Sequence, residues 1–144
     1  MKKILTLVCC TILLAATSCT KKYVSPATTN RTIIYDKAAS DWKAGNADPS
    51  GPLGDYYYLD ISGNDLPELD GPFQQFGAVL VYMSFDGGTT YEAVPETIGG
   101  FAYSFQHSVR NIRIYSQTPN NATALNPDVA VTIKVVLIDS NDAS

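Results

Sequence analysis

The stretch Val129-Ala130-Val131-Thr132-Ile133-Lys134-Val135-Val136-Leu137-Ile138 decides the fold class. Successive side chains of an extended strand point to opposite faces, so every second residue here falls on one apolar face. That face consists of Val129, Val131, Ile133, Val135 and Leu137, with Thr132 and Lys134 opposite. We expect Val131, Ile133 and Val135 to be buried. Because so apolar a strand would promote aggregation at an open edge, we also expect it to lie inside a sheet.

Six further segments before this run are rich in β-branched and aromatic residues and are separated by Gly, Pro or Asn, which is typical of strands. They are residues 32–35, 56–61, 78–84, 89–94, 101–107 and 111–115. The loop Phe85-Asp86-Gly87-Gly88 can supply the positive φ of a hairpin between the third and fourth segments. About seven strands in succession predict an all-β fold, a single antiparallel β-sandwich.

Helical signals in the same region are few. Residues 36–43 form a marginal candidate, because eight residues hardly sustain an isolated helix, and a single turn is expected near residues 67–75.

The N-terminus has the pattern of a secretory signal. Lys2 and Lys3 precede thirteen uncharged residues, 4–16, and small or polar residues lead to Cys19. A membrane-spanning helix needs about 20 apolar residues, so a permanent span is not expected. Residues 16–19, Ala-Thr-Ser-Cys, resemble a lipobox, although Leu is preferred where Ala16 stands. This resemblance implies cleavage after residue 18 and acylation of Cys19; the alternative is an ordinary secretory peptide followed by a chance cysteine.

The expected organisation follows from this processing. Residues 1–18 are a lipoprotein signal peptide, residues 19–31 a lipidated flexible linker, residues 32–139 the β-sandwich, and residues 140–144 a disordered tail. The linker is expected because its residues are polar and lack apolar periodicity. Several acyl chains on one residue give stable membrane attachment, so the membrane is an expected partner. With one cysteine left after cleavage, no intramolecular disulfide can form.

Charge is distributed unevenly along the chain. Without Lys2 and Lys3, eight basic residues face 14 acidic ones, and residues 44–109 contain no Lys or Arg. A nucleic-acid-binding surface needs clustered basic side chains. We therefore expect no nucleic-acid partner, and take the acidic residues as the solubilising charge of an exported domain.

Three segments resemble a family of small, uncharacterised bacterial lipoproteins with a C-terminal β-sandwich-like domain. They are residues 77–82 (GAVLVY), 110–115 (RNIRIY) and 133–138 (IKVVLI), within a similarity covering about residues 32–139. The family implies no activity and no functional residues. The residues after Cys19, Thr20-Lys21-Lys22, depart from the acidic pattern of surface-exported lipoproteins, which favours a domain that faces the periplasm. Position 20 is not Asp, which argues against retention in the inner membrane. The resemblance to lipoprotein sorting patterns therefore implies the outer membrane, with the domain facing the periplasm.

Catalytic and metal sites are weakly indicated. His107 is the only histidine, whereas zinc sites usually take several His or Cys ligands and no nucleophile elbow accompanies it. Acidic pairs suited to glycoside hydrolysis are offered by Glu92 with Glu96 and by Asp65, Glu68 and Asp70, and residues 60–65 have some character of a calcium loop. Ordinary strand ends and solvated loops explain these residues better, so we expect no enzyme, no metal and no cofactor.

Aromatic residues give the remaining candidate site. If Tyr57 faces the core with Leu59 and Ile61, then Tyr56 and Tyr58 point the other way. An exposed aromatic face often marks binding, although packing against the second sheet or against Trp42 is the better explanation. The sequence thus predicts a non-enzymatic binding or structural accessory module of the cell envelope with a protein or glycan partner. The alternative is a carbohydrate-binding module that uses Trp42, Tyr56 and Tyr58.

Overall fold

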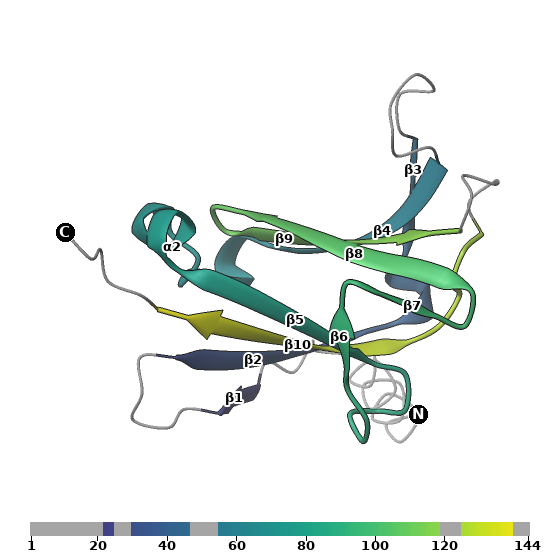
Figure 1. Ribbon diagram of the computed structural model, residues 1–144, viewed down its shortest axis with the longest axis horizontal. Coiled ribbons are helices and arrows are strands. Elements are labelled where there is room, and N and C mark those ends of the chain that lie inside the picture. Colours follow the sequence, from purple (N-terminus) through teal and green to yellow (C-terminus); the bar gives the residue numbers. More distant parts are fainter. Residues whose placement is uncertain (1–21, 25–29, 47–54, 119–124, 140–144) are drawn as a thin grey trace, which may run out of the picture.

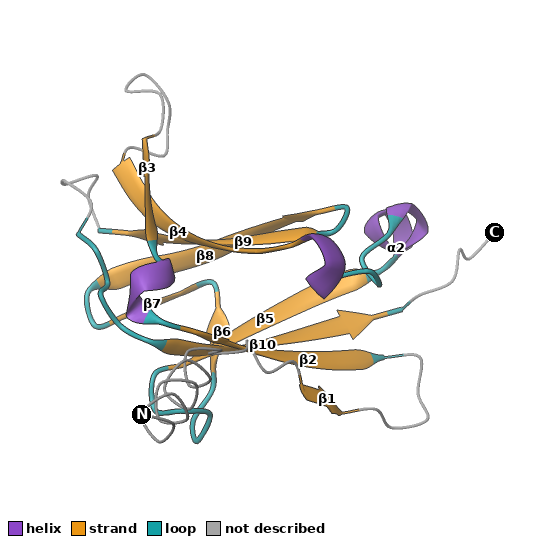
Figure 2. Ribbon diagram, turned by 180° about the vertical axis from the view of Figure 1, so that it is seen from behind, coloured by secondary structure: helices purple, strands orange, loops and turns teal. Residues whose placement is uncertain are grey.

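The computed structural model describes residues 22–24, 30–46, 55–118 and 125–139. Within these ranges the chain folds into two antiparallel sheets that pack face to face (Figure 1, Figure 2). The strand order is β1-β2-β10-β5-β6 in one sheet, here called sheet A, and β3-β4-β9-β8-β7 in the other, sheet B. The predicted all-β sandwich is confirmed.

The described residues form ten strands, against the seven expected. Sheet A consists of β1 (Lys22–Val24), β2 (Arg31–Lys37), β5 (Ala78–Ser84), β6 (Glu92–Val94) and β10 (Val131–Ile138). Sheet B consists of β3 (Lys43–Asn46), β4 (Asp55–Ser62), β7 (Glu96–Ile98), β8 (Phe101–Ser108) and β9 (Asn111–Gln117). The chain crosses from sheet A to sheet B at Pro95, whose peptide bond with Val94 is cis.

Strand β10 lies in the middle of sheet A, where its apolar pattern led us to expect it. It pairs with β2 on one side and with β5 on the other. Val131, Ile133, Val135 and Leu137 are buried, which confirms the predicted face. Val129 precedes the strand and is only partly buried against the core.

A single hydrophobic core lies between the sheets. Sheet A contributes Ile33, Tyr35, Val79, Val81, Met83 and Val94 besides the β10 residues, and sheet B contributes Leu59, Ile61, Tyr103, Ile112 and Ile114. Leu66 and Leu69, from the connection after β4, are also fully buried. At about 25 cal/mol per Å² of buried apolar surface, this core is the main source of stability in the described part of the chain, which contains no cysteine.

The helical expectation for residues 36–43 is wrong in most of its length. Asp36 and Lys37 continue β2 because they pair with Thr132 and Val131 of β10. Only Ala39–Asp41 form one 3-10 turn.

The turn expected near residues 67–75 is a six-residue helix, α2 (Gly71–Phe76). The carboxylate of Asp70 caps it by accepting a hydrogen bond from the Phe73 N–H at 2.9 Å.

The predicted hairpin between residues 78–84 and 89–94 exists, but its loop is longer than expected. Gly87 and Gly88 have φ of 72° and 90°, as predicted. Asp86 accepts hydrogen bonds from the backbone N–H groups of Thr89 and Thr90 and from the Ser84 hydroxyl. These bonds fold residues 89 and 90 into the loop, so the returning strand begins only at Glu92.

The segment expected to be a flexible linker, residues 19–31, contains a short strand. Lys22–Val24 form β1, which pairs with Thr32–Ile34 of β2 at the edge of sheet A. A pattern search misses so short a strand because its partner, rather than its own composition, stabilises it. The predicted signal peptide, Cys19 and the tail 140–144 lie outside the described residues. In the described part of the chain, no helix has the length and apolar character that crossing a membrane requires.

Candidate functional site

The outer face of sheet B carries a cluster of three tyrosines. Tyr57 packs against the core with Leu59 and Ile61, which is the condition under which Tyr56 and Tyr58 were expected to point the other way. Tyr56 and Tyr58 therefore lie on the outer face, where Tyr115 of the neighbouring strand β9 pairs with Tyr58. The Tyr56 ring lies 5.2 Å from that of Tyr115, edge-on at 72°, and 6.1 Å from that of Tyr58, tilted by 57°.

A glycine on the edge strand makes room for this cluster. Gly45 of β3 pairs with Tyr56, and a Cβ atom at Gly45 would overlap the Tyr56 ring. The ring thus rests on bare backbone. The tyrosines contact one another and the edge strand, rather than the second sheet or Trp42, so the packing expected for them is present but with other partners.

Arg113 joins the tyrosines to a charged pair. Its guanidinium lies 4.3 Å from the centre of the Tyr58 ring, within the range of a cation–π contact. The same group donates two hydrogen bonds to the Asp60 carboxylate, at 2.7 Å from Nε and 2.9 Å from Nη2. The carboxylate raises the pKa of Arg113 above its ordinary value. The pair of Arg113 and Asp60 is neutral overall.

A shallow depression adjoins the tyrosines on the β8–β9 hairpin. Its volume is about 250 Å³, and it is lined by Gln106, His107, Ser108, Asn111, Arg113 and Tyr115. The Tyr115 hydroxyl donates a hydrogen bond to the Gln106 side-chain oxygen at 3.0 Å. None of the lining side chains is acidic. The depression therefore offers amides, hydroxyls and one neutralised guanidinium to a ligand.

Trp42 does not belong to this surface, and its candidacy as a sugar platform is corrected. It is only 5% exposed and is part of the core. Its indole N–H donates a hydrogen bond to the Val129 carbonyl, and its ring packs 6.1 Å from that of Tyr103. Of the three aromatic candidates, the structure brings Tyr56 and Tyr58 together and separates Trp42 from them.

His107 lies at the end of β8, as an ordinary strand-end residue would. Its Nδ1 is 2.9 Å from the side-chain oxygen of Gln74 on α2, and its ring stacks on Phe105. The contact between His107 and Gln74 links α2 to sheet B.

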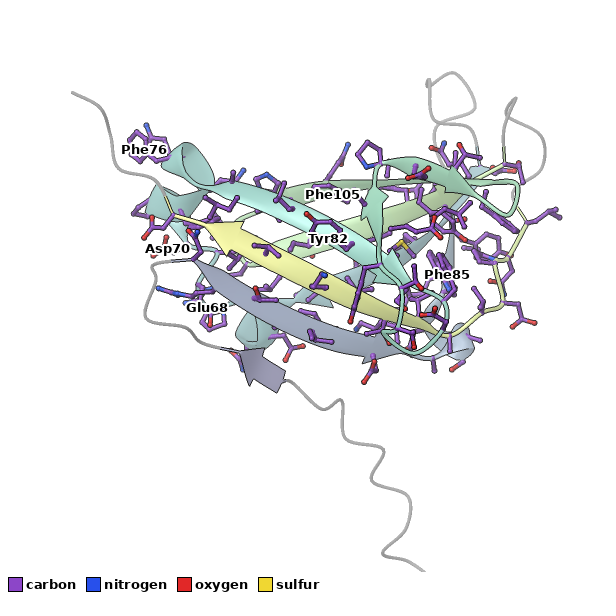
Figure 3. The ribbon with its side chains drawn as sticks, turned by 60° about the horizontal axis from the view of Figure 1, so that its bottom comes forward. Glu68, Asp70, Phe76, Tyr82, Phe85 and Phe105 are labelled. Atoms are coloured by element: carbon purple, nitrogen blue, oxygen red, sulfur yellow. The ribbon has the colours of Figure 1, made fainter. Side chains whose placement is uncertain are left out.

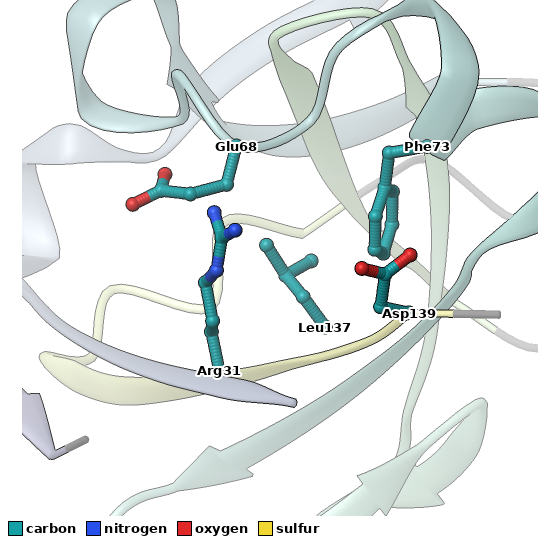
Figure 4. A pocket seen from close by; sticks show the side chains of 5 residues that line it. All are labelled: Arg31, Glu68, Phe73, Leu137 and Asp139. Carbon is teal, nitrogen blue, oxygen red and sulfur yellow. The ribbon is translucent and has the colours of Figure 1, made fainter. Parts of the chain in front are cut away.

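Glu68, one of the acidic residues considered for catalysis, lines a small cavity rather than a cleft of substrate size. Glu68 and Asp139 line one cavity with Arg31 between them (Figure 4). Its volume is about 10 Å³, enough for about one water molecule. Within the described chain, the buried Oε2 of Glu68 has no hydrogen-bond partner. A water in the cavity would satisfy that oxygen.

The calcium-like segment is explained by structural contacts. Asp60 is paired with Arg113, and the Asp65 backbone carbonyl accepts a hydrogen bond from the Tyr35 hydroxyl at 2.6 Å. Asp70 caps α2. Across the ranges that the structure describes, no group of three or more His, Cys, Asp or Glu side chains is placed to hold a metal ion.

Residues of β8 and β9 complete this surface. Alternation in residues 111–115 predicts that Arg113 points outward, and Tyr115 shares that face, because Ile112 and Ile114 face inward. Gln106 lies on the outer face of β8, where it alternates with inward-facing residues such as Tyr103. Nothing in the sequence indicated that β9 lies between β4 and β8. This strand order brings Arg113 and Tyr115 beside Tyr58 and Gln106.

No protein-family model, curated protein or solved structure matches this chain.

Proposed function

We propose that this protein is a lipid-anchored, non-enzymatic binding module of the cell envelope, and that the outer face of sheet B is its binding surface. The observation that carries this proposal is the continuity of two features on one sheet face. The cluster of Tyr56, Tyr58 and Tyr115 runs directly into the polar depression of the β8–β9 hairpin, because Tyr115 belongs to both. Half-exposed aromatic rings beside hydrogen-bonding groups are characteristic of recognition surfaces.

The surface favours a neutral ligand. Arg113 is already neutralised by Asp60, and the remaining lining groups are amides, hydroxyls and His107. A ligand rich in hydroxyl or amide groups, such as a glycan or a polar loop of an envelope protein, would satisfy them.

A carbohydrate-binding module remains the second candidate. The density of hydroxyl and amide groups around Tyr115 favours it. The tilt between the rings, 57° and 72°, does not provide the coplanar pair that stacks on the flat faces of consecutive sugars. A glycan would therefore be held mainly by edge hydrogen bonds in the depression, with a single ring contact.

The anchor is tested by Cys19→Ser. Cells that process lipoproteins are grown with radiolabelled palmitate, and the protein is followed by autoradiography and by sedimentation with membranes. We expect the substitution to abolish labelling and to move the protein to the soluble fraction. Unchanged labelling and sedimentation would contradict the anchor.

The binding surface is tested with the mature chain, residues 19–144, carrying Cys19→Ser. The protein is screened against immobilised neutral oligosaccharides and peptidoglycan fragments, and the residues involved are mapped by amide chemical shifts. We expect perturbations over β8, β9 and β4. Perturbations confined to the loop 85–91 or to sheet A would place binding elsewhere, and an absence of binders would remove the carbohydrate candidate.

A further inference from the structure

We infer that the outer face of sheet A lies on the phospholipid surface that holds Cys19, so that the binding surface of sheet B faces away from the membrane. This inference rests on the proposed lipid anchor and adds to it an orientation and a second membrane contact.

The first argument is the length of the tether. β1 begins at Lys22 and is hydrogen-bonded to β2 at the edge of sheet A (Figure 1). Only Thr20 and Lys21 separate it from Cys19. At about 3.3–3.6 Å per fully extended residue, a connection of this length can span at most about 10 Å. An acylated Cys19 therefore holds the edge of sheet A close to the lipid headgroups. A flexible linker over the whole of residues 19–31 would instead allow the domain to move away from the membrane.

The second argument is the chemistry of the outer face of sheet A. Leu80 is 42% exposed and pairs across β5 and β10 with Val136. Ile138 pairs with Ala78, and Ile34 of β2 lies opposite Lys134. Ile34, Val136 and Ile138 are partly exposed beside Leu80, and a contiguous apolar sheet face of this kind can mark a surface that another phase or molecule covers.

The charges on this face suit a lipid surface. On the described strands β2, β5 and β10, the outward positions carry two charges, Lys134 and Asp36, and the Asp36 carboxylate accepts a hydrogen bond from the Thr132 hydroxyl at 2.8 Å. The Lys134 ammonium lies 4.7 Å from the centre of the Tyr82 ring and 3.9 Å from that of Tyr91. Figure 3 looks onto this face and labels Tyr82 on β5. A lysine among aromatic rings can reach phosphate while its stem stays apolar, and Lys21 beside the anchor adds attraction to anionic headgroups.

In this orientation sheet A contacts the membrane and sheet B binds the ligand. They are the opposite layers of one sandwich (Figure 2). With sheet A on the lipid, the tyrosine cluster and the β8–β9 depression point into the aqueous compartment. Orientation by the short tether would also raise the effective concentration of the apolar face at the membrane.

The experiment uses the natural lipoprotein, produced in cells that acylate Cys19. Cys9 and Cys10 leave with the signal, so the mature protein has no free thiol. A cysteine is introduced by Ala78→Cys on sheet A or by Gln106→Cys on sheet B, since both positions are exposed. Each is labelled with an environment-sensitive fluorophore in vesicles of phosphatidylethanolamine and phosphatidylglycerol, with or without a lipid that carries a nitroxide near its headgroup.

We expect the label at residue 78 to be quenched at least threefold more than the label at residue 106. Adding Leu80→Glu to the Ala78→Cys protein should reduce that quenching by half or more, whereas Ser108→Glu in the Gln106→Cys protein should change nothing. Thermal melting establishes that each variant is folded.

Equal quenching at the two positions in protein that sediments with vesicles would overturn the orientation while leaving the anchor intact. Shielding of the residue 78 label in detergent micelles that grows with protein concentration would overturn it too, by assigning the face to a second copy of the chain. Loss of sedimentation would remove the anchor itself and this inference with it.

Discussion

Trp42 donates its indole N–H to the backbone carbonyl of Val129 at 3.0 Å, across 87 positions of the chain. The bond links the residue before β3, in sheet B, to the segment that leads into β10, in sheet A. It therefore closes the sandwich at one end. It also explains why the single tryptophan is a structural residue rather than a binding platform.

Replacing Trp42 should destabilise the fold. Trp42→Ala removes a large buried ring and should lower the free energy of unfolding by about 3–5 kcal/mol. Trp42→Phe keeps most of the packing but leaves the Val129 carbonyl without its donor, and should cost about 1–2 kcal/mol. Urea denaturation measures both values. Leu125→Ala is the control, because Leu125 is 60% exposed and its loss should change stability by less than about 0.5 kcal/mol; equal effects at the two sites would contradict this role of Trp42.

Gly45→Ala should disturb the tyrosine cluster although Gly45 is not one of its three tyrosines. The new methyl group would overlap the Tyr56 ring, so the ring must leave its place beside Tyr115. We expect a loss of stability of about 1–3 kcal/mol, typical of overpacking, together with weaker ligand binding. The control is Gly71→Ala, where a Cβ atom would meet nothing within 4 Å. Chemical denaturation of the two variants should separate them; a Gly45→Ala protein as stable as the Gly71→Ala protein would contradict the described packing.

Arg113 and Asp60 should be energetically coupled, but modestly. Their side chains are 34% and 24% exposed, so solvent screens the pair. A double-mutant cycle with Arg113→Ala and Asp60→Ala should give a coupling of about 0.5–1 kcal/mol, and the value should fall in 1 M salt. A coupling of zero at low salt would mean that the bidentate geometry is not maintained in solution.

The sequence predicted the parts of this fold that depend on a regular pattern. Alternation alone predicted that Ile133 is buried and that Tyr56 and Tyr58 point away from the face of Tyr57, because the side chains of a strand repeat every two residues. Alternation could not predict the burial of Trp42, because polar Asp41 and Lys43 flank it and its hydrogen-bond partner, Val129, lies far along the chain.

Local hydrogen bonding and strand order account for the other differences. Thr89 and Thr90 have high strand propensity, yet Asp86 binds their N–H groups and holds them in a loop. The sequence predicted only some of the residues of the candidate site. Alternation exposes Tyr56 and Tyr58, but only the order of β4, β9 and β8 adds Tyr115 to them.

Asp86 should make stability depend on pH in the acid range. The Thr90 N–H and then the Ser84 hydroxyl lower the pKa of its carboxyl group from 3.8 to about 2. A carboxyl whose pKa is lower in the folded state binds its proton more readily when unfolded, so its contribution is complete above about pH 4 and is lost as the pH falls toward 2. Asp86→Ala should therefore lower the melting temperature at pH 6, and the difference from the wild type should shrink between pH 4 and pH 2. A difference that stays constant over that range would contradict the assignment.

The most direct test of the account is calorimetric titration of the strongest-binding oligosaccharide from the screen into three proteins: the wild-type mature chain with Cys19→Ser, and the same chain with Tyr115→Ala or with Tyr82→Ala. Tyr115 joins the tyrosine cluster to the depression on sheet B, whereas Tyr82 lies on the outer face of sheet A. We predict that Tyr115→Ala weakens binding at least tenfold, because both the ring contact and the hydroxyl are lost, and that Tyr82→Ala leaves affinity unchanged. Wild-type affinity in the Tyr115→Ala protein, or its loss in the Tyr82→Ala protein, would contradict the claim that sheet B carries the binding surface.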